Sequence, residues 1–155
     1  MNKWIPYYIE QAKNIASMSK DPSSKVGCII VSPDNIPVAQ GFNGMVSECD
    51  ESFMSWERPY KYFVVRHAEE NAVIFSRRDI SGCTAYVTHG PCERCLGMLL
   101  QAKVRTIYYD CAGIMKDRGS DMQLWAIEAL IKSTGAKVIN ANNNKEYLEE
   151  LKEGK

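Results

Sequence analysis

The sequence contains no apolar run of about 18 residues, the length that a membrane-spanning helix requires. It also has no charged segment followed by an apolar stretch, the pattern that opens a secretory signal peptide. These absences argue against a membrane protein and against a secreted one. We therefore expect a cytoplasmic protein that does not bind membranes.

An excess of charge of either sign is also lacking, because 19 Lys and Arg residues balance 19 Asp and Glu residues. A balanced chain has no global field that draws it to DNA, RNA or an anionic surface. We expect no polymeric nucleic acid among its partners. An anionic small molecule would have to be bound by local groups.

No repeat, low-complexity tract or linker divides the 155 residues, a length that suits one compact domain. We expect residues 1–155 to form a single domain. The six cysteines would suit a disulfide framework in a secreted protein, but without a signal peptide reduced thiols are favoured. Only Cys92 and Cys95 have the close spacing of a metal-binding pair.

The periodicity of apolar residues predicts an alternation of helices and strands. Helices are expected at 3–18, 67–77, 92–102 and 121–133, with a charged terminal helix starting at 142–144, and strands at 26–31, 36–40, 83–88, 104–109 and 137–139. A helical crossover joins the third and fourth strands, which should therefore be parallel. The alternation predicts an α/β fold with helices on both faces of one sheet.

Two connecting segments also carry predictions. Gly41, Phe42, Asn43 and Gly44 are expected to form a tight turn, in which glycine allows positive φ or close approach to a ligand. Residues 110–119 are expected to form a polar loop. The long connection from 45 to 62 exceeds what compact domains usually spend on a bare loop, which indicates a functional segment or a partner contact.

The chemistry is concentrated in two short segments, His67-Ala68-Glu69 and Cys92-Glu93-Arg94-Cys95. One imidazole and two thiolates can hold a zinc ion and leave its fourth position to water, which is the ligand count of zinc enzymes that activate water. The two cysteines should open a helix, whose dipole favours the thiolate. Glu69 is the candidate to take up and return the proton of that water.

Each segment alone has a more ordinary interpretation. A CxxC pair in an α/β protein can be a redox pair or half of a structural zinc site, and a lone histidine is more often a hydrogen-bonded structural residue. Glu70 is expected to be a solvated or structural carboxylate. The conjunction of His-x-Glu with Pro-Cys-x-x-Cys is, however, the signature of zinc nucleobase deaminases.

With these motifs the chain resembles the zinc-dependent cytidine and deoxycytidylate deaminase superfamily, and its deoxycytidylate branch in particular. The resemblance spans residues 20–139 and adds to the zinc segments Ser24-Lys25-Val26-Gly27, the Gly41 to Gly44 segment, Trp56, Arg58, Lys61 and Tyr62. The usual branch motif has tyrosine where this chain has Phe42.

The resemblance implies a three-layer α/β/α cytidine-deaminase-like fold with a five-stranded mixed sheet. It implies hydrolytic deamination of dCMP to dUMP and ammonia, which supplies dUMP for thymidylate synthesis. One Zn²⁺ per chain would be held by His67, Cys92 and Cys95, with Glu69 as the catalytic residue. It further implies a homo-oligomer, a hexamer in relatives, activated by dCTP and inhibited by dTTP, with Mg²⁺ on a bound triphosphate.

Nucleotide contacts are assigned to Lys25, Asn43 and Ala68. The Asn43 amide can bond a sugar or base and the Lys25 ammonium a phosphate, although a turn residue and a surface charge explain them equally well. By resemblance, Gly41, Phe42, Asn43 and Gly44 belong with Phe75 and Arg78 to the effector site, and Arg78 could instead be a salt-bridged helix residue. Many relatives stack an aromatic residue of the loop after the fourth strand on the base, and here Tyr109 and Trp125 are the candidate substitutes.

Two alternatives stay open. One is a zinc deaminase of another substrate, such as cytidine, deoxycytidine, guanine or a tRNA adenosine, and the balanced charge argues against the tRNA substrate. The other is a non-catalytic nucleotide-binding subunit with structural zinc. A purely structural site has no need of a carboxylate such as Glu69 beside the metal.

Overall fold

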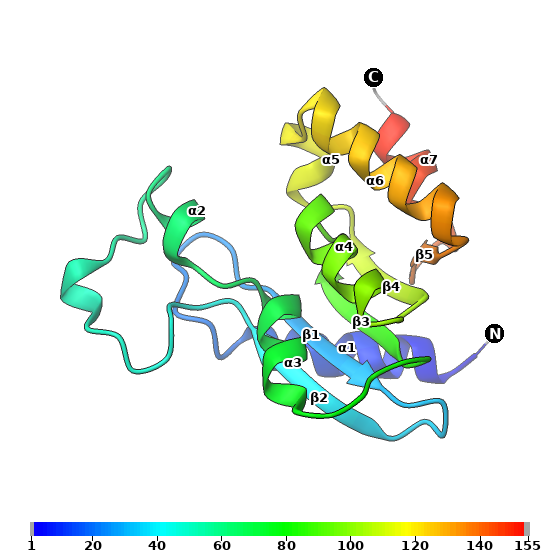
Figure 1. The fold of residues 1–155 in the computed structure, drawn as a ribbon, viewed down its shortest axis with the longest axis horizontal. Helices are drawn as coiled ribbons and strands as arrows, with labels where there is room; N and C mark the ends of the chain where they lie inside the picture. Colours follow the sequence, from blue (N-terminus) through cyan, green and yellow to red (C-terminus); the bar gives the residue numbers. More distant parts are fainter. Residues whose placement is uncertain (1, 154–155) are drawn as a thin grey trace.

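A five-stranded sheet with the strand order β2-β1-β3-β4-β5 forms the centre of the computed structural model, which describes residues 2–153 (Figure 1). The strands are β1 (Gly27–Val31), β2 (Pro37–Phe42), β3 (Thr84–His89), β4 (Thr106–Cys111) and β5 (Lys137–Asn140). β1 pairs antiparallel with β2 and with β3, whereas β3, β4 and β5 are parallel. The predicted α/β fold with a five-stranded mixed sheet is confirmed, as is the parallel pairing of the third and fourth strands.

Helices cover both faces of this sheet. They are α1 (Trp4–Ala16), α2 (Lys61–Val64), α3 (Ala68–Ser76), α4 (Glu93–Gln101), α5 (Ile114–Arg118), α6 (Asp121–Thr134) and α7 (Tyr147–Lys152), with a 3₁₀ helix η1 (Glu51–Phe53). The apolar stripe of α1 packs on one face, and buried residues of α3, α4, α6 and α7 form the larger core on the other. Within residues 2–153, every helix is too short or too polar to traverse a lipid bilayer.

Two glycines set how closely the helices approach the sheet. A Cβ atom on Gly27 would lie 2.0 Å from the carbonyl oxygen of Ala12 in α1. A Cβ atom on Gly41 would lie 2.5 Å from the carbonyl oxygen of Ala68 and 2.5 Å from the backbone nitrogen of Ala72, both in α3. Both strand positions therefore exclude a side chain because a helix backbone occupies the space.

The predicted turn from Gly41 to Gly44 is wrong. Gly41 and Phe42 continue strand β2, and Gly44 pairs with Arg66 in an isolated β-bridge. The glycines with positive φ in the described part of the chain are Gly82, Gly113 and Gly135. Gly41 is needed for contact with α3 rather than for a positive φ, so the chain stays extended.

Two further segments differ from expectation. Helix α5 lies within the predicted loop 110–119, because one buried side chain, Met115, anchors a helix too short to show a period. The terminal helix begins at Tyr147 instead of 142–144. There Asn140 Oδ1 accepts a hydrogen bond of 2.8 Å from the Asn142 backbone N–H, which turns the chain before the helix.

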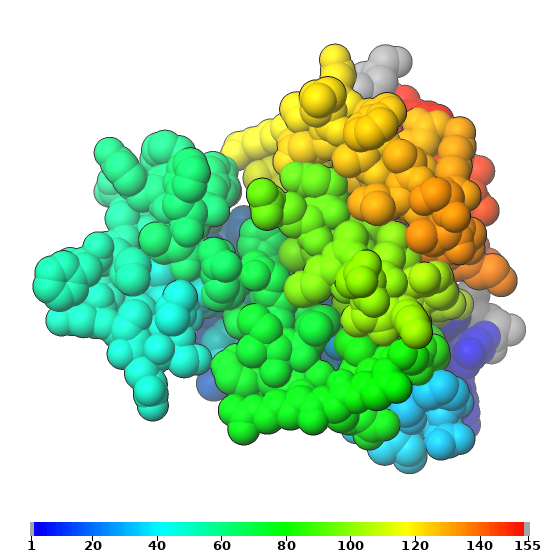
Figure 2. All heavy atoms as spheres, in the orientation of Figure 1, coloured from blue at the N-terminus to red at the C-terminus, as the bar shows by residue number. Residues whose placement is uncertain are grey.

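The long connection between β2 and α3 forms a lobe that stands away from the rest of the molecule (Figure 2). A buried ion pair holds the lobe against the segment before β1. Lys61 Nζ lies 2.9 Å from Asp21 Oδ2, and the two side chains are only 6% and 2% exposed. Lys61 Nζ also donates to Ser23 Oγ at 2.8 Å. This cluster joins the lobe to the segment that leads into β1.

Candidate active site

His67 is held at the N-terminus of α3 by hydrogen bonds on both sides. The β-bridge of Gly44 with Arg66 fixes the residue before it. Glu70 Oε1 then accepts a hydrogen bond of 3.1 Å from the His67 backbone N–H, and Glu70 also pairs with Arg66 at 3.4 Å. Glu70 therefore has a structural position, as expected, and His67 is presented at the edge of the sheet.

Cys92 and Cys95 open helix α4 directly after β3 ends. Cys92 is the N-cap residue, and its Sγ accepts a hydrogen bond of 3.5 Å from the Cys95 backbone N–H. Helix α7 holds the turn between β3 and α4 in place, because the hydroxyl of its first residue, Tyr147, donates a hydrogen bond of 2.9 Å to the Pro91 carbonyl oxygen. The positive end of the helix dipole lies at these sulfurs and favours their thiolate forms.

The structure brings the three candidate zinc ligands together. His67 Nδ1 lies 3.3 Å from Cys95 Sγ and 3.6 Å from Cys92 Sγ, and the ligand atoms all lie within 4.8 Å of one another. A tetrahedral zinc ion with ordinary bond lengths separates its nitrogen and sulfur ligands by about 3.6 Å. The three residues therefore fit zinc, with Nδ1 rather than Nε2 as the histidine ligand.

The pKa values of the three candidate ligands are shifted in different directions. Hydrogen bonding to Cys95 and then to His67 lowers the pKa of Cys92 to about 4, and the hydrogen bond with Cys92 raises the pKa of His67 to about 9. The hydrogen bond with Cys92, followed by burial, raises the pKa of Cys95. A divalent cation replaces protons in such a donor set.

Glu69 lies in the first turn of α3, buried to 4% exposure. Burial, followed by the negative charge of Cys92, raises the pKa of Glu69 to about 7, while His67 opposes this shift. A carboxyl group with a pKa near neutrality can both accept and donate a proton under working conditions. The arrangement can therefore combine a metal-activated water with an acid and base.

The family model for the cytidine and deoxycytidylate deaminase zinc-binding region matches residues 2–111. This chain belongs to that family. The predicted family and the predicted enzyme class, a zinc-dependent deaminase, are thereby confirmed.

Individual relatives agree with the assignment. The deaminase is 39% identical over 108 residues to an uncharacterized deaminase in the luxG 3' region of Aliivibrio fischeri, covering 70% of this chain and 73% of that protein. It is 36% identical over 114 residues to the deoxycytidylate deaminase of Mus musculus, covering 69% of this chain and 64% of the mouse protein. The match thus spans just under two thirds of the mouse enzyme.

A solved structure covers more of the chain. The dCMP deaminase of the cyanophage S-TIM5, in complex with dCMP and dUMP, superposes with a TM-score of 0.68 at 29% identity, covering 90% of this deaminase and 98% of the phage chain. Acinetobacter baumannii RibD has the same fold, with a TM-score of 0.63 at 22% identity over 96% of this chain and 37% of that one.

The residues predicted to contact the nucleotide have different environments in this deaminase. Asn43 is buried, where its Oδ1 accepts from the Val26 N–H at 2.8 Å and its Nδ2 donates to the Ser24 carbonyl oxygen at 2.8 Å. Ala68 is fully buried, and Lys25 is exposed beside a small cavity of about 350 Å³. The Asn43 side chain therefore already organises the start of β1, and the three contacts stay predictions.

The residues predicted for an effector site surround α3. Phe42 and Phe75 are 39% and 51% exposed, and Asn71 of α3 donates a hydrogen bond of 2.8 Å to the Phe42 carbonyl oxygen. Arg78 lies exposed just past the end of the helix, where its Nε donates to the Asp79 carbonyl oxygen. These residues could respond together to a ligand, and that role stays a prediction.

Tyr109 is not available to stack on a base. It is fully buried, and its ring packs against that of Tyr147 with centroids 4.8 Å apart. The alternation of strand β4 turns this side chain into the core. Trp125 on α6 is 67% exposed and lines neither of the two cavities, so the structure assigns no aromatic partner to the base.

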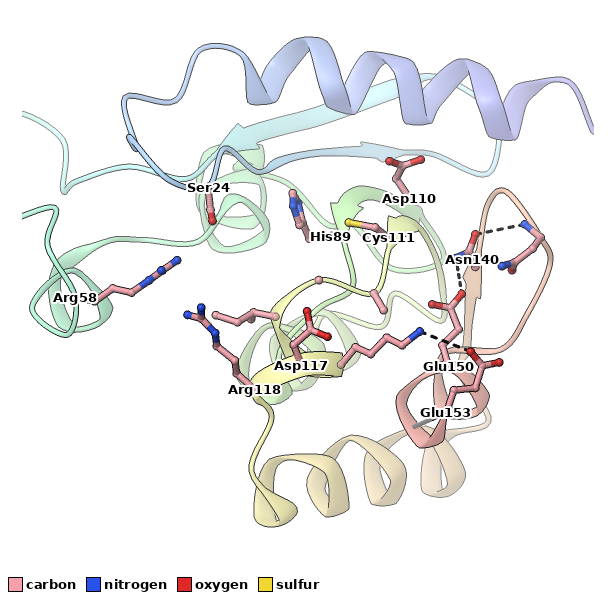
Figure 3. Close-up of a pocket in the computed structure, with 15 residues that line it drawn as sticks. Ser24, Arg58, His89, Asp110, Cys111, Asp117, Arg118, Asn140, Glu150 and Glu153 are labelled. Carbon is pink, nitrogen blue, oxygen red and sulfur yellow. Dashed lines mark hydrogen bonds and ion pairs between the residues drawn. The ribbon is translucent and has the colours of Figure 1, made fainter. Parts of the chain in front are cut away.

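Sequence reasoning missed the groups around a larger cavity of about 640 Å³ at the same edge of the sheet (Figure 3). Its walls include Ser24, His89, Cys111, Arg58 from the lobe, and Arg118 from the predicted loop. The zinc ligands and Glu69 are not among its lining residues, but His89 lies three positions before Cys92. Ser24 and Arg58 belong to segments that carry the family resemblance, but the sequence assigned no role to their side chains, because only the three-dimensional structure gathers the five residues around one cavity.

Proposed function

We propose that this chain catalyses the hydrolytic deamination of dCMP to dUMP and ammonia, supplying dUMP for thymidylate synthesis. The observation that carries the proposal is the convergence of His67, Cys92 and Cys95 beside the buried carboxyl group of Glu69. The relatives named deoxycytidylate deaminase and the phage enzyme in complex with dCMP and dUMP support this substrate.

A zinc ion held by His67 Nδ1, Cys92 Sγ and Cys95 Sγ would supply a water molecule of lowered pKa at its open position. Glu69 accepts a proton as this water adds to C4 of the cytosine ring. Glu69 then gives one proton to N3 and helps to transfer another to the departing amino group. Water is consumed, the C4–N bond breaks, and ammonia and the uracil ring remain.

Residues 1–155 form one deaminase domain with one zinc ion in this proposal. Lys25, Asn43 and Ala68 contact the nucleotide, the last through its backbone because its side chain is fully buried. The protein acts in the cytoplasm.

A homo-oligomer, as large as a hexamer, is part of the proposal, with dCTP as activator, dTTP as inhibitor and Mg²⁺ on the bound triphosphate. The lobe between β2 and α3 supports an interface, because Phe53 and Phe63 are 85% and 78% exposed. Exposed apolar groups clustered on one segment are typical of contact surfaces. The effector would act at Gly41, Phe42, Asn43, Gly44, Phe75 and Arg78, around the helix that carries His67 and Glu69.

One assay tests the reaction and its substrate. Purified zinc-loaded protein is incubated separately with dCMP, deoxycytidine and tRNA, with and without dCTP, and ammonia and the deaminated product are measured. We expect ammonia and dUMP in equal amounts from dCMP, at a higher rate with dCTP. Release of ammonia from tRNA or deoxycytidine alone would assign another substrate. Release from none of these, nor from cytidine or guanine, would indicate a non-catalytic protein.

A further inference from the structure

The larger cavity has arginine side chains from two distant segments at its mouth. Arg58 comes from the lobe and Arg118 from the end of α5, and both guanidinium groups point toward the same opening (Figure 3). Within residues 2–153, neither guanidinium group donates a hydrogen bond to the protein or forms an ion pair. Both are thus available to an anionic ligand.

The other charges in the cavity wall are mostly neutralised. Lys116 pairs with Glu153 at 3.6 Å, and Asp110 pairs with Lys13 at 3.5 Å. Glu150 keeps its negative charge, because the hydrogen bond that it accepts comes from the neutral amide of Asn140, but it lies on the side of the cavity away from the two arginines (Figure 3). Asp117 is the acidic exception near the two arginines. Two planar guanidinium groups against one carboxylate favour a doubly charged anion that accepts bidentate hydrogen bonds, such as a phosphate monoester.

The position of this cavity fits one end of a nucleotide. The phosphate of a cytidine nucleotide lies at the opposite end from C4, so a phosphate site belongs beside the zinc centre and not within it. His89 in the cavity wall ends β3, and the Cys92 turn follows directly. Ser24 on another wall is bound through its carbonyl oxygen to Asn43 at 2.8 Å.

The buried ion pair of Lys61 with Asp21 fixes the wall that carries Arg58. Arg58 lies three residues before Lys61, and Ser24 lies three residues after Asp21. The contact of 2.9 Å between these buried charges therefore holds the lobe segment against the segment that leads into β1. A pair this well buried is costly to break, so it keeps the Arg58 backbone in place.

We propose that Arg58 and Arg118 bind the 5′-phosphate of the nucleotide and select a monophosphate over a nucleoside. The identity of the nucleotide rests on the proposed function, whereas the anion site rests on the cavity and its charges. Ser24 faces the same cavity and offers its hydroxyl as a further donor. Lys25 lines the adjoining smaller cavity, so its ammonium group adds a further positive charge to the nucleotide contacts already proposed.

Calorimetric binding of dUMP and of deoxyuridine to the zinc-loaded full chain tests this assignment. Arg58→Gln and Arg118→Gln should each weaken dUMP binding by about tenfold, the effect of losing a charged hydrogen bond, and leave deoxyuridine binding unchanged. The control is Arg77→Asn, which removes the same charge away from the cavity. Arg77 has φ of 51°, a conformation that asparagine tolerates.

Unchanged dUMP binding in both glutamine variants would overturn the assignment. So would a wild-type protein that binds dUMP no more tightly than deoxyuridine, or a loss of the preference in Lys25→Gln alone. Activity separates this inference from the proposed function. Arginine-dependent dUMP binding without turnover of dCMP would refute only the function, and turnover with full kcat/KM in both arginine variants would refute only the phosphate site.

Discussion

At the scale of single residues, two adjacent glutamates at the start of α3 have different environments. Glu69 is buried beside the candidate zinc ligands, whereas Glu70 accepts a hydrogen bond from the His67 backbone N–H. Glu69→Gln should retain zinc and lower turnover of dCMP by about 10²- to 10⁴-fold, because an amide cannot exchange the proton. Ammonia release and metal analysis provide the two measurements.

Glu70→Gln is the matched control, since its amide oxygen can still accept the hydrogen bond from His67 and most of the activity should remain. Equal loss of activity in the two variants would mean that Glu69 has no special role in proton transfer.

The grouping of His67, Glu69, Cys92 and Cys95 could be predicted from sequence, because each pair lies within three residues at the start of one helix. Asn43 could not be understood in this way. Its amide bonds to Ser24 and Val26, which are about twenty positions earlier, and only the sheet brings them together. Arg118 lies within the predicted polar loop 110–119, and only the folded structure brings it to the same cavity as Arg58.

At the scale of elements, the contact of α3 with β2 depends on the absence of a side chain at Gly41. Gly41→Ala should lower the free energy of unfolding by about 1–3 kcal/mol, because its Cβ would meet backbone atoms of α3 that cannot move alone. Turnover of dCMP should also fall, since α3 carries His67 and Glu69. Urea denaturation measures the first effect.

Gly44→Ala is the control for that substitution, since a Cβ atom there would have no neighbour within 4 Å. Its free energy of unfolding should stay within about 0.5 kcal/mol of wild type. If both alanine variants lose the same stability, the close approach of α3 to β2 is not what requires glycine at position 41.

The buried ion pair at the base of the lobe predicts a dependence of stability on pH. Burial raises the pKa of Asp21, but hydrogen bonds from the Ser23 backbone N–H and from Lys61 outweigh it, so the pKa lies below the ordinary value. A carboxyl group with a depressed pKa stabilises the fold above its unfolded pKa, about 3.9, and this contribution is lost as the pH falls through the folded pKa.

Asp21→Asn should therefore be less stable at pH 7, by about 3–5 kcal/mol, because it leaves the Lys61 charge buried without its partner. It should also lose less stability than wild type on acidification below pH about 4. Asp34→Asn, at an exposed position, serves as control. Parallel stability curves for Asp21→Asn and wild type in acid would show that this pair does not contribute.

Most helices and strands were predictable, because each contains enough residues for the spacing of its apolar side chains to distinguish a helix from a strand. The exceptions are short or depend on distant contacts. Helix α5 has five residues and a single buried side chain, and the start of α7 is set by the Asn140 side chain. The extension of β2 through Phe42 reflects the packing of α3 on Gly41, which no local propensity records.

At the scale of the whole molecule, the alternation of helices and strands sufficed for the α/β class and for the parallel half of the sheet. The strand order was not predictable, because β1 lies between β2 and β3 through antiparallel pairing over more than fifty positions with β3. That order places the start of β1 and the ends of β2, β3, β4 and β5 at one edge. The candidate zinc ligands and the larger cavity lie at this edge.

The most direct test of the central claim is the release of ammonia from dCMP by protein whose zinc content is measured in the same sample. Zinc-loaded protein should contain one ion per chain and yield dUMP and ammonia in equal amounts. Removal of the metal by a chelator should abolish turnover, and one equivalent of zinc should restore it. Full activity in metal-free protein, or no product from the zinc-loaded protein, would contradict the account.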